Sequence, residues 1–284
     1  MSVRYFSLKL NLLTFLAAKT SRIKLGTAVL TLPWHNPVLL AEQVATTDLL
    51  SNGRIQLGVG KGYRYNEFKG FKIDMNEANE RFHESIDIMV KSWENKEKWS
   101  YSGKFWSFED IIVEPSCYQL PYPTLWMAAG NNESIKNVAK KNANLLLDQF
   151  SPLNEVIKRV QVYKNELEKN NFNNDTSNKI ALARALYIAK NKKEKIEVIE
   201  KRMEARSKVD KLSERPDRKN NSSIMSFKGP DEALNGALIG TEDEIHERLI
   251  NLKENGVGYL LLVDAGGGIN HLRYFAKKIM PMYH

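Results

Sequence analysis

The feature that most constrains this chain is its alternation of short apolar runs with longer amphipathic patterns. Several runs are apolar without interruption, which is typical of strands covered on both faces of a parallel sheet. We expect strands at residues 23–31, 55–59, 124–128, 145–148, 180–189 and 259–264. We expect helices at residues 36–50, 77–95, 132–142, 153–169, 192–212, 242–255 and 268–278. This alternation predicts βαβ units and an α/β fold with a parallel sheet.

Two segments interrupt the alternation. Residues 99–113 carry closely spaced aromatic side chains around Gly103, which predicts a small hairpin inserted in a loop. Residues 213–240 are rich in Ser, Asn, Pro, Gly and charge, which favours a mobile loop. Loops of this length often act as lids in barrels, and the same composition is also typical of plain disorder. The chain as a whole, residues 1–284, is expected to form a single domain.

The charge balance bears on the kind of partner. The chain has 42 Lys and Arg against 34 Asp and Glu, a formal charge of +8. Its lysines are spread among glutamates along stretches such as 192–211, whereas a nucleic-acid face gathers cations and interleaves aromatics. We therefore expect no nucleic-acid partner, while the general positive field favours an anionic ligand.

Cysteine and apolar usage predict a cytoplasmic protein without a membrane span. Cys117 is the only cysteine in the sequence, which excludes an intrachain disulfide and a cysteine-built zinc site. The apolar run at 10–18 is too short for a span and leads directly into a strand, so we expect an ordinary helix rather than a signal peptide. Neither a metal-ligand spacing nor a nucleophile elbow is present in the sequence, so we expect no metal and no hydrolase triad.

Three alternating glycines, Gly58, Gly60 and Gly62, follow an expected strand. They lack the Walker spacing with its Lys-Ser/Thr ending, and they lack the third glycine of the Rossmann pattern. Close approach of the backbone to a flat ring system explains them better, because glycine has no side chain to prevent it.

Two turns have the composition of an anion site. Residues 130–134, Gly-Asn-Asn-Glu-Ser, follow a strand and open a helix, so free N–H groups and the positive helix end can hold a phosphate there. Simple N-capping by Asn131 or Asn132 is the alternative. Residues 264–268, Asp-Ala-Gly-Gly-Gly, form the competing site, with a tight turn as its alternative. For Glu133 and Asp148, the sequence leaves two interpretations open: a functional role, or capping or neutralising a neighbour.

His35 is the candidate catalytic residue. It lies just beyond an expected strand end, beside Trp34 and Asn36, where the catalytic loops of a barrel lie. Contact with a cofactor or substrate is one interpretation, and a structural histidine is the other.

Three sequence blocks resemble the bacterial luciferase-like flavin monooxygenases: TSRIKLGTAV at 20–29, LPWHNPVLLAEQVATTD at 32–48 and GRIQLGVGKG at 53–62. The likeness continues through 67–68, 80–82 and 126–134, and ends at 275–281. It implies a (β/α)8 TIM barrel and a monooxygenase that uses reduced FMN and O2 to oxygenate a small organic substrate. In such a system a separate flavin reductase supplies the FMNH2.

The resemblance also implies cofactor-binding residues, at Ala28, Gly60, Lys61, Arg81, Asn131 and Ser134. Arg81, Asn131 and Ser134 occupy phosphate positions, and Lys61 stands where bacterial luciferase has an arginine near the phosphate. Gly60 lies beside the flavin. Ala28 and the next residue match a non-proline cis peptide behind the flavin ring.

The family normally starts with a β-α-β unit that leads to a Glu-His-His or similar segment, and this chain begins after it. The six expected strands, against eight in a closed barrel, indicate the same deficit. We therefore expect a shortened barrel, an activity that the truncation impairs, and a homodimer that covers exposed apolar surface. Two alternatives stay open: a deazaflavin- or flavin-dependent hydride-transferring reductase of the same superfamily, and a non-catalytic flavin-binding or assembly subunit.

Overall fold

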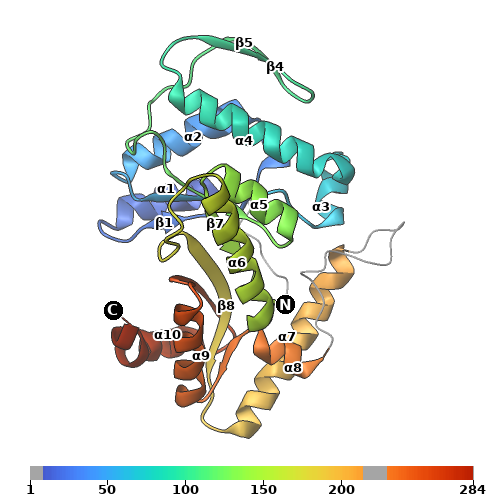
Figure 1. Ribbon diagram of the computed structural model, residues 1–284, viewed down its shortest axis with the longest axis vertical. Helices are drawn as coiled ribbons and strands as arrows, with labels where there is room; N and C mark the ends of the chain where they lie inside the picture. Colours follow the sequence, from blue (N-terminus) through green and yellow to red (C-terminus); the bar gives the residue numbers. More distant parts are fainter. Residues whose placement is uncertain (1–8, 214–228, 284) are drawn as a thin grey trace. The chain divides into compact units, whose positions relative to one another are not determined.

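The computed structural model describes residues 9–213 and 229–283. They fall into two compact units, Met1–Ala128 and Ala129–His284 (Figure 1). Both units contain parallel strands connected through helices, which confirms the predicted α/β class. Within the described part of the chain, no helix combines the length and the apolar character that crossing a membrane requires.

The first unit is built around one central strand, β3 (Ile55–Gly60). β1 (Leu25–Gly26) and β2 (Leu30–Thr31) pair with successive parts of β3, and β6 (Thr124–Ala128) also pairs with it, all in parallel. The main helices are α1 (Lys9–Lys19), α2 (Pro37–Leu50) and α4 (Ala78–Glu94), with shorter turns at η1 (Leu32–Trp34), α3 (Tyr65–Gly70) and η2 (Met75–Glu77).

Local sequence explains where α2 and α4 lie. The Asn36 side chain accepts hydrogen bonds from the N–H groups of Val38 and Leu39 at 3.0 and 3.2 Å, which caps the start of α2. Pro37, which has no N–H to satisfy, takes the first helical position. In α4, Phe82, Ile86 and Met89 are buried at helical spacing, so this face packs into the core as the sequence pattern predicts.

The strand expected at residues 23–31 is interrupted rather than continuous. The hydroxyl of Thr27 donates to the Gly58 carbonyl at 2.7 Å and accepts from the Gly58 N–H at 3.0 Å. A hydroxyl is both donor and acceptor, so this side chain takes over the bonds of the backbone ladder between β1 and β2. In the same interruption, the peptide bond between Ala28 and Val29 is cis.

Arg54 fixes the end of α1 against the turn before β3. Its guanidinium donates to the carbonyls of Ala17, Thr20 and Ile23 at 2.9, 3.0 and 3.1 Å. A further bond from Nε reaches the Ser51 carbonyl at 2.6 Å. One side chain therefore satisfies the Ala17 carbonyl at the end of α1 together with carbonyls of the neighbouring turns.

Residues 99–113 contain an antiparallel pair, β4 (Trp99–Ser102) and β5 (Ser107–Ile111), as expected of a hairpin. Figure 1 shows this β4–β5 hairpin beside α4, and side chains of α4 bind its turn.

The second unit is built around β8 (Ile180–Ile188). β7 (Asn144–Leu147), β9 (Leu238–Gly240) and β10 (Tyr259–Asp264) all pair with β8 in parallel. The helices are α5 (Asn132–Lys140), α6 (Leu153–Lys169), α7 (Lys192–Ser213), α8 (Pro230–Asn235), α9 (Glu242–Glu254) and α10 (Gly268–Tyr274), followed by η3 (Phe275–Ile279) and η4 (Met280–Tyr283).

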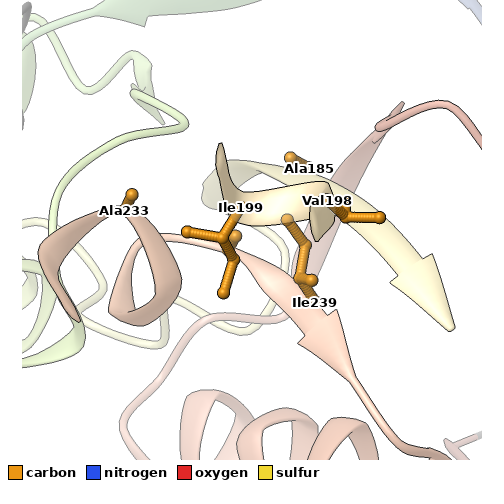
Figure 2. Packing of buried hydrophobic residues seen from close by; sticks show 6 residues of the cluster. Ala185, Val198, Ile199, Ala233 and Ile239 are labelled. Carbon is orange, nitrogen blue, oxygen red and sulfur yellow. The ribbon is translucent and has the colours of Figure 1, made fainter. Parts of the chain in front are cut away.

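The prediction of a mobile loop at residues 213–240 is wrong for the last part of that segment. Residues 214–228 lie outside the described residues, whereas α8 and β9 occupy 230–235 and 238–240. Figure 2 shows the reason: Ala233 and Ile239 pack with Ala185, Val198 and Ile199 in one buried cluster. Small alanines carry much of this contact, and they leave only a weak hydrophobic pattern in the sequence.

Candidate functional site

Gly58 and Gly60 on β3 lie against the 27–29 segment at very short range. A Cβ atom at residue 58 would lie 1.8 Å from the Thr27 carbonyl oxygen, and one at residue 60 would lie 2.7 Å from Cγ2 of Val29. Both positions therefore require glycine for packing within the chain itself. For Gly58 this replaces the predicted approach to a flat ring, because the neighbouring backbone fills that space. Gly60 remains a predicted cofactor neighbour.

His35 lies at the end of η1, where its N–H donates to the Leu32 carbonyl at 2.9 Å. The pKa of its half-buried imidazole is lowered by burial, and the Lys9 ammonium lowers it further. Lys9 itself donates a hydrogen bond to the Val29 carbonyl. The imidazole is therefore neutral near physiological pH, with one nitrogen able to donate and the other able to accept.

The structure gathers several predicted residues of the first unit near the end of β3. Thr31 pairs with Gly60, and Lys9 connects the 27–29 segment to the surroundings of His35. Lys61 comes immediately after β3, and its side chain is exposed. The carboxyl ends of parallel strands are where α/β proteins bind ligands, so this placement suits a binding site.

Arg81 lies in the first turns of α4 and is already paired. Its Nε and Nη2 contact one carboxylate oxygen of Glu77, at 2.9 and 2.8 Å. Its guanidinium also lies 4.2 Å from the centre of the Phe105 ring. Sequence reasoning selected Arg81 but missed Glu77, although the spacing of four residues in a helix is a signal that could have found it.

The turn of the β4–β5 hairpin is bound by Glu84, another residue that sequence reasoning missed. The Glu84 carboxylate accepts hydrogen bonds from the N–H groups of Phe105 and Trp106 at 3.1 and 3.0 Å. Lys104 of the same turn pairs with Glu80 at 2.6 Å. Nothing in the local sequence relates these residues, because about twenty positions separate them.

Asn131 and Ser134 belong to the second unit and form a local cap at the start of α5. The Asn131 side-chain oxygen accepts from the Ser134 N–H at 2.9 Å and from its hydroxyl at 2.7 Å. This is the N-capping geometry that the sequence left open beside phosphate binding. The Asn131 amide also has N–H donors, so capping and anion binding are chemically compatible.

The competing glycine-rich turn at 264–268 already holds an anion of its own. One carboxylate oxygen of Asp264 accepts from the N–H groups of Gly266, Gly267 and Gly268 at 3.2, 2.9 and 2.9 Å. These are the donors that a phosphate would need, so the structure favours the tight-turn interpretation.

Asp148, which the sequence left open, organises the turn after β7. Burial alone would raise its pKa, but hydrogen bonds from Phe150 and Ser151 and the charge of Arg159 lower that pKa overall. The fully buried Arg184 supports the same turn by donating to the Asp148 and Ser151 carbonyls at 3.1 and 2.8 Å. Sequence reasoning missed Arg184, although a charge inside an apolar strand is a signal that could have found it.

Two further kinds of chemistry find no support in the described residues. Among them, no group of three or more His, Cys, Asp or Glu side chains is placed to hold a metal ion. Burial raises the pKa of Cys117 to about 12, with the Asp48 charge adding to the effect, so this thiol stays protonated and unreactive.

The donors at the predicted phosphate positions suit a phosphorylated cofactor in their chemistry. They comprise a guanidinium, an ammonium, a hydroxyl and an amide, all of which donate to phosphate oxygens. Two of these donors already have partners within the chain: Arg81 pairs with Glu77, and the Ser134 hydroxyl donates to Asn131. Fold and chemistry together define an α/β protein in which each unit carries candidate donors to a phosphorylated small molecule.

The family follows from comparison with known proteins. The family model described as luciferase-like monooxygenase matches residues 4–258. The chain therefore belongs to the luciferase-like monooxygenase family.

Two curated relatives illustrate the similarity. The oxygenase component of the flavin-dependent trigonelline monooxygenase from Acinetobacter baylyi is 31% identical over 180 residues, covering 61% of this chain and 48% of that protein. The FMNH2-dependent dimethylsulfone monooxygenase of Pseudomonas putida is 23% identical, covering 94% of this chain and 76% of that protein. The chain thus spans about half the length of the first of these relatives.

Solved structures share the fold of the chain. Monooxygenase RslO1 from Streptomyces bottropensis aligns with a TM-score of 0.80 and 23% identity, covering 97% of this chain and 83% of that one. An F420-dependent secondary alcohol dehydrogenase aligns with the same TM-score and 14% identity, covering 97% and 84% of the two chains. At these identities the likeness shows the fold alone, and it confirms the predicted barrel-type α/β architecture.

Proposed function

We propose that this chain is the oxygenase of a two-component monooxygenase, in which reduced FMN and O2 oxygenate a small organic substrate. The family match over residues 4–258 carries the proposal. The relatives named as an oxygenase component and as an FMNH2-dependent monooxygenase support the cofactor and a separate flavin reductase as partner. The bound flavin supplies the reducing electrons and the reactivity toward O2.

The protein side chains bind and orient in this proposal. In the first unit, Arg81 and Lys61 are the proposed phosphate donors, by charge and hydrogen bonds. The second unit has its own candidate donors, Asn131 and Ser134. Ala28 and Gly60 shape the ring pocket and help to exclude water from it. The neutral imidazole of His35 offers one donor and one acceptor to the flavin or the substrate, so it can orient either partner or relay a proton.

An anaerobic titration tests the cofactor half of the proposal. We expect saturable binding of FMN and FMNH2, followed by flavin fluorescence and absorbance, and at least a tenfold loss of affinity in Arg81→Ala because a charged bond to phosphate is lost. Arg22→Ala, at an exposed arginine, is the matched control and should bind as the wild type does. Absence of saturable binding in the wild type would defeat the proposal.

Turnover is tested separately, with NADH, a flavin reductase and a panel of small organic substrates. Substrate-dependent oxygen uptake with an oxygenated product supports the monooxygenase. Flavin binding without oxygenation of any substrate would favour the non-catalytic subunit instead.

The hydride-transferring reductase is the second candidate, because the F420-dependent dehydrogenase shares the fold as fully as the monooxygenase does. Parallel titrations with FMN and with F420 separate the two. Tighter binding of the deazaflavin, with substrate-dependent loss of its absorbance and no oxygen uptake, would replace the first candidate. We also propose that the protein acts as a homodimer, which light scattering of the purified protein tests.

A further inference from the structure

In the first unit, the guanidinium of Arg81 already has partners. The Glu77 carboxylate takes its Nε and Nη2 groups at 2.9 and 2.8 Å, and the Phe105 ring covers the guanidinium at 4.2 Å. The Nε and Nη2 groups form one of the two-pronged edges through which an arginine binds a carboxylate or a phosphate. An internal carboxylate therefore uses the donors that an incoming phosphate would need.

The surroundings of the Arg81–Glu77 ion pair allow another anion to replace Glu77. The side chains of Arg81 and Glu77 are 23% and 36% exposed, so water reaches both partners. Pairs in such surroundings are weak, because solvent screens the attraction and compensates for its loss. A phosphate carries more charge than a carboxylate and can accept from Nε and Nη2 with two separate oxygens, whereas Glu77 uses one oxygen, so a phosphate can displace Glu77 at small cost.

The neighbouring carboxylates have other partners. Glu80 pairs with Lys104 at 2.6 Å, and Glu84 accepts from the N–H groups of Phe105 and Trp106. The Phe105 ring contacts the Arg81 guanidinium at 4.2 Å, and this contact does not involve Glu77. Of the carboxylates Glu77, Glu80 and Glu84, Glu77 is the one with a direct contact to Arg81 among the described residues.

We propose that Glu77 is a built-in competitor for the flavin phosphate: it holds Arg81 in the free protein and is displaced when FMN binds. This inference rests on the proposed function. Glu77 thereby sets how strongly the protein prefers FMN over a flavin without a phosphate. It also keeps binding loose enough for the cofactor to exchange with a reductase.

The test compares FMN with riboflavin, which has the same ring and no phosphate. Dissociation constants for both flavins are measured by fluorescence quenching in the wild type and in Glu77→Gln, Arg81→Ala and Glu80→Gln. Glu77→Gln removes the competing charge and should raise the preference for FMN about fivefold, the scale of one partly exposed ion pair. Arg81→Ala should lower the preference tenfold or more.

Glu80→Gln is the matched control, because it removes the same charge from the same helix and leaves the Glu77–Arg81 pair in place. Its preference should stay within about twofold of the wild type, since a surface charge without direct contact is screened. Equal effects of Glu77→Gln and Glu80→Gln would overturn the inference in favour of a general field. An unchanged preference for FMN over riboflavin in Glu77→Gln would overturn the inference as well. A lowered preference would also overturn it, because Glu77 would then help to position Arg81 for the phosphate.

Thermal unfolding of each variant shows that the compared proteins are folded. Failure of the wild type to bind FMN would count against the proposed function. Binding that depends on Arg81 but ignores Glu77 would count against this inference alone.

Discussion

Single residues in this protein have roles that their residue type alone does not determine. Thr27 takes over ladder bonds through its hydroxyl, and Asp264 saturates the N–H groups of the glycine turn that follows it. Gly58 belongs to a motif that resembles a cofactor loop, yet its missing side chain makes room for the carbonyl of Thr27. At this scale, a residue type indicates a set of possible roles, and the three-dimensional neighbour selects one.

Gly58→Ala tests the packing role of that glycine. The added Cβ would lie 1.8 Å from the Thr27 oxygen, so the backbone has to move, and we expect a loss of unfolding free energy of about 3 kcal/mol or more. Gly70→Ala is the control, since no atom lies within 4 Å of its added Cβ. Urea unfolding of both variants gives the comparison. Equal stabilities would contradict the packing explanation.

His35 should make stability depend on pH. Burial and Lys9 hold the pKa of His35 below its ordinary value near 6.5, so the folded protein binds fewer protons there than the unfolded chain does. The stabilising contribution of His35 is therefore complete at pH values above its pKa in the unfolded chain. It is lost as the pH falls from that value towards the lower pKa of His35 in the folded protein.

His35→Gln should accordingly lose less unfolding free energy than the wild type between about pH 7 and about pH 5. Lys9→Met, which removes the second cause, should show part of the same change. Urea titrations at each pH measure the difference. Parallel pH profiles of wild type and His35→Gln would rule the effect out.

At the scale of elements, periodicity predicted the long helices and most strands, because burial of one face repeats along them. The failures have physical causes. The strand at 23–31 is broken by a side chain that bonds to another strand, and α8 and β9 were missed because small alanines supply much of their buried surface. The candidate site was predicted in part. Capping by Asn131 follows from helix-start chemistry, and Ser134 was selected through the family resemblance. The contacts of Arg81 with Phe105 and of Glu84 with the hairpin depend on long-range packing.

The β4–β5 hairpin offers a prediction at this scale. Glu84→Ala leaves the N–H groups of Phe105 and Trp106 without their carboxylate acceptor, and we expect a loss of about 1–2 kcal/mol and faster hydrogen exchange at these two amides. Glu80→Ala breaks an exposed pair with Lys104 and should change the unfolding free energy by less than about 0.5 kcal/mol. Unchanged exchange in Glu84→Ala would show that the hairpin is held by its packing alone.

For the whole molecule, the sequence predicted the α/β class from alternation, and the family resemblance agrees with the match over residues 4–258. The two compact units, Met1–Ala128 and Ala129–His284, were not predicted, because both contain the same kinds of element and no linker composition separates them.

Binding of FMN should stabilise the folded protein. A ligand present at 100 times its dissociation constant raises the free energy of unfolding by about 2.7 kcal/mol when it binds only the folded state. We expect this shift for FMN by differential scanning fluorimetry, and a smaller shift at the same concentration of riboflavin, which has no phosphate. Equal shifts for both flavins would show that the phosphate donors contribute nothing.

The carboxylate of Asp264 has a consequence for how the protein responds to the ions around it. Because this anion is covalently attached, its effective concentration at the three N–H groups exceeds that of any free phosphate or sulfate in a cell. The turn is thus insensitive to the changing salt composition of its surroundings. A phosphorylated ligand therefore finds these three N–H groups already occupied. Its affinity depends on the donors that remain available elsewhere in the protein.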